Sequence, residues 1–321
     1  MTEGAAPIEV RGLVKRYGEL TAVAGVDLTV NTGDVYGYLG PNGAGKTTSL
    51  RMMLGLIKPT EGSVRLFGRD PMQSISALEG VAGFVEAPTF YPYLNARKNL
   101  EMLAAYDGGG AGDRIDSALE TVELTDRAKD RVGGYSHGMR QRLGIAAALL
   151  REPRLLLLDE PATGLDPAGM RDMRLLIRRL ADQGMTVMLS SHLLTEVEDV
   201  CNRVAIVRSG RIVYEGEIAA LKRGAGTAYR LETTDDERAL AVCNAQPGVT
   251  DVRIQHGKIT FTTDEPGAAE LSQALVEAGA LIRALAPQTV TLEDLFFRFT
   301  EGDEPAAAPP TSDPAPAQAA R

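Results

Sequence analysis

The sequence contains few cysteines and no long apolar segment. Only Cys201 and Cys243 occur among its 321 residues, far apart and outside any C-x-x-C pattern. This argues against a disulfide framework or a zinc site and suits a reducing cytosol. No apolar run approaches the ~20 residues that cross a bilayer, and the N-terminus carries no basic patch followed by an apolar stretch. We therefore expect any membrane role to depend on a partner.

The chain also lacks an excess of positive charge. It has 34 Lys and Arg residues against 43 Asp and Glu residues, which gives a formal net charge of −9 at pH 7. A nucleic-acid partner is therefore not expected. No internal repeat is present. Because typical domains hold roughly 100 to 200 residues, the length predicts two structural units.

The most informative segment is a glycine-rich loop, Gly-Pro-Asn-Gly-Ala-Gly-Lys-Thr-Thr at positions 40–48. The apolar run 35–39 predicts a strand before it, and 47–57 predicts a helix after it. In this G-x-x-x-x-G-K-T pattern, backbone N–H groups converge on phosphate oxygens. Lys46 is expected to reach the β and γ phosphates, and Thr47 to offer its hydroxyl to Mg²⁺. The sequence therefore predicts a nucleoside triphosphate site.

Short apolar runs alternate with longer helical patterns from residue 8 to about residue 224, which predicts an α/β fold with a parallel core. The clearest strand-like runs are 35–39, 155–158, 187–190 and 204–207. Beyond residue 226 the pattern changes to a βαββαβ order, which predicts a small second domain. Its expected elements are strands at 229–233, 249–254, 258–263 and 281–286 and helices at 236–245 and 268–278.

The end of the chain is predicted to contain one more helix and a disordered tail. The helix, 292–299, is expected to close the small domain. Segment 301–321 is rich in Pro and Ala and has no periodic apolar face, so it is predicted to be disordered. The expected organisation is therefore a large domain at 1–224, a small domain at 227–300 and a tail at 301–321.

Two carboxylates follow the apolar run 155–158. Ligands of open α/β sheets bind at the carboxyl edge of the strands, where Asp159 and Glu160 would lie. Asp159 is expected to hold Mg²⁺, directly or through water, and Glu160 to orient or deprotonate the attacking water. An apolar run that ends in Asp-Glu is common by itself, and the phosphate loop upstream is what favours catalysis.

Segment 136–142, Ser-His-Gly-Met-Arg-Gln-Arg, resembles the signature of ATP-binding-cassette (ABC) ATPases, whose usual form is Ser-Gly-Gly-Gln followed by x-Gln-Arg. The similarity continues in order from about residue 8 to residue 216. Tyr17 is placed like the aromatic residue that stacks on adenine, 163–166 resembles the D-loop, and 190–192 resembles the switch-histidine segment. The resemblance implies a P-loop ABC cassette with a helical subdomain, followed here by a small α+β domain.

In that family two cassettes form a head-to-tail dimer, and each ATP lies between the phosphate loop of one protomer and the signature of the other. The resemblance therefore implies a homodimer in which Ser136 and Gly138, at the start of a helix, face the partner's γ-phosphate. His192 would contact the γ-phosphate and the attacking water, whereas His256 is expected to be a surface residue.

The expected site has three parts. Lys46, Glu160 and His192 are the expected catalytic residues. The expected Mg²⁺ ligands are Thr47, Asp159 and Glu86. The expected nucleotide contacts are Tyr17, Gly40, Asn42, Gly43, Gly45, Lys46, Thr47, Thr48, Glu86, Ser136, Gly138 and Asp166.

Three residues depart from the family pattern. His137 replaces the first signature glycine and Met139 replaces the signature glutamine, which would alter the fit around the partner's nucleotide. Activity is still expected, because the other signature residues are retained. Glu86 stands where the Q-loop carries glutamine, and it would either bind Mg²⁺ or its water more strongly than an amide, or face solvent and do little. The pattern around Glu86 resembles cassettes of the bacitracin and lantibiotic resistance type.

Phe90, Tyr91 and Tyr93 lie within four positions directly after this loop. In the family this region faces the groove that receives a cytoplasmic helix of the permease. We therefore expect the three aromatic residues to form a docking surface, and packing inside the protein is the alternative.

The leading hypothesis is the ATP-hydrolysing subunit of an ABC transporter, which works with ATP and Mg²⁺ and drives a separate transmembrane permease. It would lie at the cytoplasmic face of the membrane, held there by the permease. Export of a drug, an antibiotic or a lipophilic compound is favoured, since the βαββαβ domain resembles the accessory domain of bacterial export cassettes.

Two other hypotheses remain open. A soluble ABC ATPase acting on nucleic acid or ribosomes is disfavoured by the single set of motifs and the lack of sustained heptads. A regulatory cassette that binds ATP with little turnover is motivated by His137, Met139 and Glu86. The sequence identifies neither the permease nor the transported compound.

Overall fold

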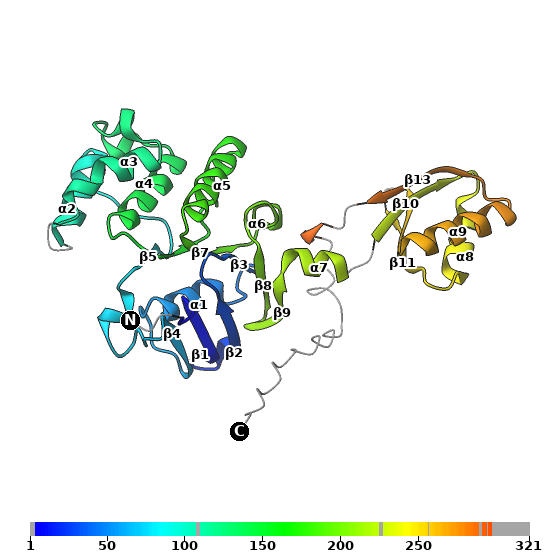
Figure 1. The fold of residues 1–321 in the computed structure, drawn as a ribbon, viewed down its shortest axis with the longest axis horizontal. Coiled ribbons are helices and arrows are strands. Elements are labelled where there is room, and N and C mark those ends of the chain that lie inside the picture. The colour runs from blue at the N-terminus through cyan, green and yellow to red at the C-terminus, as the bar shows by residue number, and fades with distance from the viewer. Residues whose placement is uncertain are drawn as a thin grey trace, which may run out of the picture.

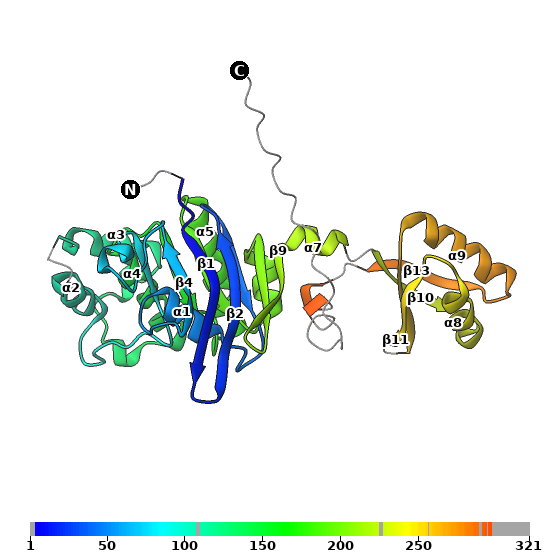
Figure 2. The same cartoon turned by 90° about the horizontal axis from the view of Figure 1, so that it is seen from below.

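The computed structural model describes residues 4–106, 110–224, 227–255, 257–288, 291–293 and 295–296. The predicted tail at 301–321, His256 and part of the predicted helix 292–299 lie outside the described residues. Residues 227–288 form a unit of their own beside the remaining elements, as both views of the ribbon show (Figure 1 and Figure 2).

Six strands form the central sheet, in the order β5-β6-β7-β3-β8-β9. Their bounds are β5 Val81–Phe84, β6 Leu155–Asp159, β7 Thr186–Ser191, β3 Val35–Leu39, β8 Arg203–Arg208 and β9 Arg211–Glu217. The pairs from β5 to β8 are parallel, and β9 joins β8 in antiparallel fashion. This confirms the parallel core. It also brings the carboxyl ends of β3, β6 and β7 together at one edge, where the glycine-rich loop, Glu160 and His192 follow them.

The central sheet is buried on both faces. Leu156 and Leu158 of β6 belong to one hydrophobic cluster, and Leu155 and Leu157 to another on the opposite face. Because side chains of a strand alternate between faces, a strand covered on both sides needs apolar residues at every position. This is why the run 155–158 consists of four leucines.

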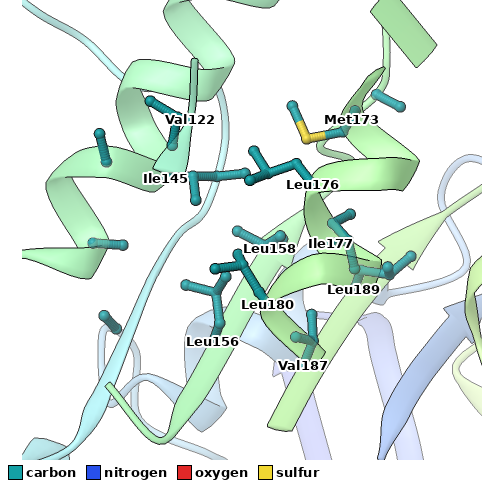
Figure 3. Packing of buried hydrophobic residues seen from close by; sticks show 14 of the residues in the cluster. Val122, Ile145, Leu156, Leu158, Met173, Leu176, Ile177, Leu180, Val187 and Leu189 are labelled. Carbon is teal, nitrogen blue, oxygen red and sulfur yellow. The ribbon is translucent and has the colours of Figure 1, made fainter. Parts of the chain in front are cut away.

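Helices cover the first face. Helix α5 (Pro167–Asp182) turns Met173, Leu176, Ile177 and Leu180 toward the sheet, at the spacing of an amphipathic helix (Figure 3). The same cluster extends into a helical subdomain. Its helices are α2 Ala96–Tyr106, α3 Ile115–Thr121 and α4 His137–Leu149.

An antiparallel sheet covers the opposite face, in the order β2-β1-β4. Its strands are β1 Ile8–Tyr17, β2 Leu20–Val30 and β4 Glu61–Leu66. The sequence did not predict this sheet, because β-bulges interrupt the alternation of apolar residues, for example between Val10 and Leu13 of β1. Together with helix α1 (Lys46–Met53), it buries Tyr36 and Tyr38 of β3 completely.

Helix α1 ends at Met53, earlier than the predicted end at residue 57. Gly55 adopts a φ of 70°, and the N–H groups of Gly55 and Leu56 donate to the carbonyl oxygens of Met52 and Arg51 at 3.0 and 2.8 Å. This is a Schellman arrangement, in which a glycine with positive φ closes the last turn.

The second unit has the predicted βαββαβ order. Its elements are β10 Thr227–Thr233, α8 Asp236–Ala245, β11 Thr250–Gln255, β12 Lys258–Thr263, α9 Glu265–Glu277 and β13 Ile282–Gln288. The strands pair in antiparallel fashion in the order β11-β12-β10-β13. The unit has its own core, which includes Leu231, Phe261, Leu271 and Cys243.

The segment after this unit returns to the first core. Leu292 and Leu295 are 0% and 2% exposed and belong to the cluster of the central sheet. The backbone N–H of Leu292 donates to Glu198 Oε2 at 2.9 Å. Glu198 lies on α6 (Leu194–Val200) and pairs with Lys222 on α7 (Ile218–Gly224). The expectation that this segment closes the small domain is therefore wrong, since its described residues pack against the large one.

Candidate functional site

The glycine-rich loop connects β3 to α1 at the carboxyl edge of the central sheet. Gly43 and Gly45 have φ values of 82° and 98°, and a Cβ atom on Gly45 would lie 2.3 Å from the carbonyl oxygen of Ala22. Only glycine fits there without strain. Lys46 is 5% exposed, and its Nζ donates to the carbonyl oxygens of Gly40 and Pro41 at 2.8 and 3.3 Å. The buried ammonium group of Lys46 therefore lies against the backbone of the loop.

Asp159 ends β6 and is 6% exposed. Ser190 of the neighbouring strand β7 donates through Oγ to Asp159 Oδ1 at 2.5 Å and accepts from the backbone N–H of Glu160 at 3.0 Å. Ser190 therefore fixes both residues of the Asp-Glu pair. Sequence reasoning assigned Ser190 no role, because the contact depends on which strands are neighbours.

Glu160 joins the two remaining predicted catalytic residues. Its Oε1 lies 3.3 Å from Lys46 Nζ, and its Oε2 accepts from His192 Nδ1 at 2.8 Å and from Thr163 Oγ1 at 2.7 Å. Burial raises the pKa of Glu160, but the Thr163 hydrogen bond and the charges of Lys46 and His192 outweigh it and lower this pKa below its usual value. The carboxylate is therefore held in its ionised form.

Ser136, Gly138 and Asp166 form a second group, where helices α4 and α5 begin. Ser136 and Asp166 cap these helices by accepting from the backbone N–H groups of Met139 and Gly169 at 3.2 and 3.1 Å. An open cavity of about 310 Å³ lies between the two helix starts. The helix N-termini and Arg142 favour an anion in this cavity, whereas the carboxylates of Asp166 and Asp172, which also line it, oppose one.

The structure pairs Glu86, the third predicted magnesium ligand, with a cation. The carboxylate of Glu86 is largely exposed and pairs with Arg51 of α1. Glu86 has a φ of 71°, a strained value for a residue with a side chain. An ion pair with a neighbouring cation neutralises the extra charge that a carboxylate brings to this loop. The geometry thus gives no support to a magnesium role for Glu86, which stays a prediction.

Several predicted contact residues lie at the surface. Tyr17, at the end of β1, is 48% exposed and has Lys15 Nζ 5.1 Å from its ring centroid. Tyr91 and Tyr93 are 48% and 64% exposed, with ring centroids 5.7 Å apart, whereas Phe90 packs against the first core. Phe90 therefore follows the packing alternative, and docking by Tyr91 and Tyr93 stays a prediction.

A buried lysine in a glycine-rich loop, beside two carboxylates at the end of a parallel strand, defines a P-loop nucleotide-binding protein. Comparison with known families matches residues 23–163 to the ABC transporter family. The bacitracin transport ATP-binding protein BcrA of Enterococcus faecalis is 37% identical over 92% of this chain and 96% of its own length. The daunorubicin/doxorubicin resistance ATP-binding protein DrrA of Streptomyces peucetius is 35% identical over 93% of this chain and 94% of its own.

Solved structures of ATP-binding cassettes have the same fold as this chain. The ATP-binding subunit of an ABC transporter matches with a TM-score of 0.60 and 27% identity, over 68% of this chain and 92% of that one. A dimeric ATP-binding cassette with ADP and phosphate bound has the same fold, with a TM-score of 0.58 and 24% identity over 66% of this chain and 98% of its own. The protein therefore belongs to the ABC transporter family, as one of its ATP-binding subunits.

Proposed function

We propose that this protein hydrolyses ATP as a homodimer and thereby drives a separate membrane permease that exports a drug, an antibiotic or a lipophilic compound. The observation that carries the proposal is the similarity to bacitracin and daunorubicin resistance subunits over more than nine tenths of the chain, which includes the small domain. In the part of the chain that the structure describes, no helix is long and apolar enough to cross a bilayer. In the proposed transporter the separate permease would supply the membrane-spanning part.

The residues present fit a magnesium–nucleotide complex. Glycine at positions 40 and 45 lets the loop lie directly against neighbouring backbone, since a Cβ atom there would lie 2.6 and 2.3 Å from the carbonyl oxygens of Val207 and Ala22. Lys46 and the loop N–H groups would bind the phosphates, and Thr47 and Asp159 would hold Mg²⁺, which neutralises phosphate charge when bound. The described residues contain no cluster of three or more His, Cys, Asp or Glu side chains that would hold a metal alone. A hydroxyl, one carboxylate and the phosphates form the usual set for Mg²⁺.

Glu160 is proposed as the base and His192 as its positioning partner. Oε2 of Glu160 is occupied by His192 and Thr163, so Oε1 is the oxygen left to accept the proton of the attacking water. Because the pKa of Glu160 is lowered, the base stays ionised at neutral pH. His192 Nδ1 donates to the ionised carboxylate, which orients the imidazole ring beside the base, and contact of this ring with the γ-phosphate stays a prediction.

The dimer supplies the second half of each proposed site. Ser136, Gly138 and Asp166 of one protomer would face the nucleotide on the phosphate loop of its partner, where two helix N-termini favour the γ-phosphate. The large domain, proposed at 1–224, would carry this chemistry at the cytoplasmic face of the membrane. Tyr91 and Tyr93 are proposed to contact the permease.

The test is to identify the partner. A tagged Glu160→Gln form, expected to retain ATP, is expressed in its native cell, loaded with ATP and purified after gentle solubilisation of membranes. A polytopic membrane protein in stoichiometric amount is the expected result. The matched control is Lys46→Ala, which should recover less of that protein when ATP is added, because it binds the nucleotide weakly.

Other results would redirect the proposal. Ribosomal proteins or nucleic acid in the purified material would favour a soluble ABC ATPase. Absence of any partner, together with a turnover near zero that Glu160→Gln leaves unchanged, would favour a regulatory cassette. Once a permease is identified, its deletion is expected to increase sensitivity to the exported compound, which can be sought among peptide antibiotics and lipophilic drugs.

A further inference from the structure

His137, which departs from the family signature, contacts the D-loop of its own chain. It is the first residue of α4, and its Nε2–H donates to the carbonyl oxygen of Thr163 at 3.1 Å. A Cβ atom on Gly164 would lie 3.6 Å from the imidazole ring, so the ring lies directly over the turn. Gly164 has a φ of 76°, which a residue other than glycine rarely adopts. The signature helix and the D-loop are thus joined by a polar contact and by close packing.

Thr163 continues the contact to Glu160. Its hydroxyl donates to Glu160 Oε2 at 2.7 Å, and its backbone N–H donates to the carbonyl oxygen of Glu160 at 3.1 Å. Both bonds fall within one tight turn, so a shift of Thr163 rotates the carboxylate directly. Because His192 occupies the same Oε2, the two donors together fix which carboxylate oxygen faces the nucleotide.

We propose that His137 and Thr163 are positioning residues, which connect the signature segment of one protomer to the carboxylate of Glu160 in that same protomer. This inference rests on the proposed function, in which Glu160 is the base and the signature faces the partner's nucleotide. The contact then runs from one nucleotide site to the other: the signature touches the partner's ATP, and Thr163 holds the base for this protomer's own ATP. Occupancy of one site thereby sets the alignment of the base in the other.

The first experiment compares matched variants at Thr163. Thr163→Val keeps the shape of the side chain but removes the hydroxyl, whereas Thr163→Ser keeps the hydroxyl. The expected loss of kcat for the valine variant is about ten- to a hundredfold, the rate equivalent of one hydrogen bond to a charged group. KM for ATP is expected to change less than twofold, and serine should restore kcat. Equal kcat in both variants, or a loss that appears only in KM, would overturn the role of Thr163.

The second experiment separates the two directions in which His137 can act. Dimers are assembled from two differently tagged protomers, and one of them carries Glu160→Gln, so that a single site hydrolyses ATP. In the first arrangement, His137→Ala lies on the protomer with intact Glu160. In the second, it lies on the Glu160→Gln protomer, whose signature faces the active nucleotide.

The proposal predicts a loss of about threefold in kcat for the first arrangement and a smaller loss for the second. His137→Gln, which offers an N–H donor at the length of Nε2, should restore the rate, and the shorter His137→Asn should not. An equal or larger loss in the second arrangement would show that His137 acts directly on the partner's nucleotide, and would overturn the connection. A different result would contradict the proposed function itself: a dimer with Glu160→Gln in both protomers would hydrolyse ATP at the wild-type rate.

Discussion

Substitution of Leu295 by alanine tests how the end of the chain stabilises the molecule. Leu295 is 2% exposed and packs in the cluster of the central sheet, not in the core of the small domain. Truncation of a buried leucine to alanine costs about 2 to 5 kcal/mol. The cost depends on how far the neighbouring side chains can close the space left behind, and we expect the low end, about 2 kcal/mol. The free energy of unfolding should decrease for the large domain alone.

The two cysteines report the two cores separately. Cys201 is buried in the cluster of the central sheet and Cys243 in that of the small domain. Burial raises the pKa of both thiols, for Cys243 to about 11, so neither reacts quickly in the folded protein. Pulsed thiol labelling followed by peptide mass spectrometry therefore measures how often each core opens. A cost of about 2 kcal/mol corresponds to labelling of Cys201 that is about 30 times faster, with Cys243 unchanged.

Leu271→Ala is the matched control. Leu271 lies on α9, is fully buried in the core of the small domain, and loses the same atoms. It should accelerate labelling of Cys243 and leave Cys201 protected. If Leu295→Ala instead exposes Cys243 and not Cys201, the segment stabilises the small domain, and the assignment of Leu295 to the first core is refuted.

Three further predictions concern the candidate site. Lys46→Ala should weaken ATP binding by about tenfold or more, since a buried charge-assisted donor is lost, and a calorimetric affinity equal to wild type would exclude phosphate contact. Glu160→Gln should lower kcat by about 10² to 10⁴, and should tighten ATP binding because Lys46 loses the competing carboxylate at 3.3 Å; single-turnover and equilibrium-binding experiments measure the two effects. Glu86→Gln removes an exposed ion pair with Arg51, so the Mg²⁺ dependence of turnover should not change, and a shift in that dependence would restore the magnesium role.

The sequence predicted those parts of the fold that produce a regular pattern of apolar and polar residues along the chain. Strands β3, β6, β7 and β8 of the central sheet were predicted because burial on both faces requires continuous apolar runs, whereas the outer strands β5 and β9 were not predicted. The βαββαβ unit was found from its alternating elements. The antiparallel sheet was missed because β-bulges disrupt the alternation of its apolar residues. The packing of Leu292 and Leu295 in the first core was missed because the local sequence does not indicate which of two cores an apolar segment packs against.

The same distinction applies to the site. Lys46, Asp159 and Glu160 were predicted because phosphate binding and hydrolysis need those residue types next to a strand end, and their roles stay predictions. The partners that orient them, Ser190 and Thr163, were not, because a hydroxyl in a motif does not reveal its acceptor. Arg51 was also missed: it is 35 residues from Glu86, and only the folded chain brings them together.

Lys46 and Glu160 link the proposed nucleotide binding to catalysis through a single ion pair. The ammonium group of Lys46 lies near Glu160 Oε1, the one carboxylate oxygen that neither Thr163 nor His192 holds. A triphosphate carries more negative charge than one carboxylate, so it competes for Lys46 and draws it from Oε1. The oxygen released is the one proposed to accept the proton of the attacking water. The base would then become available only where a phosphate has bound Lys46, which limits proton abstraction to a loaded site.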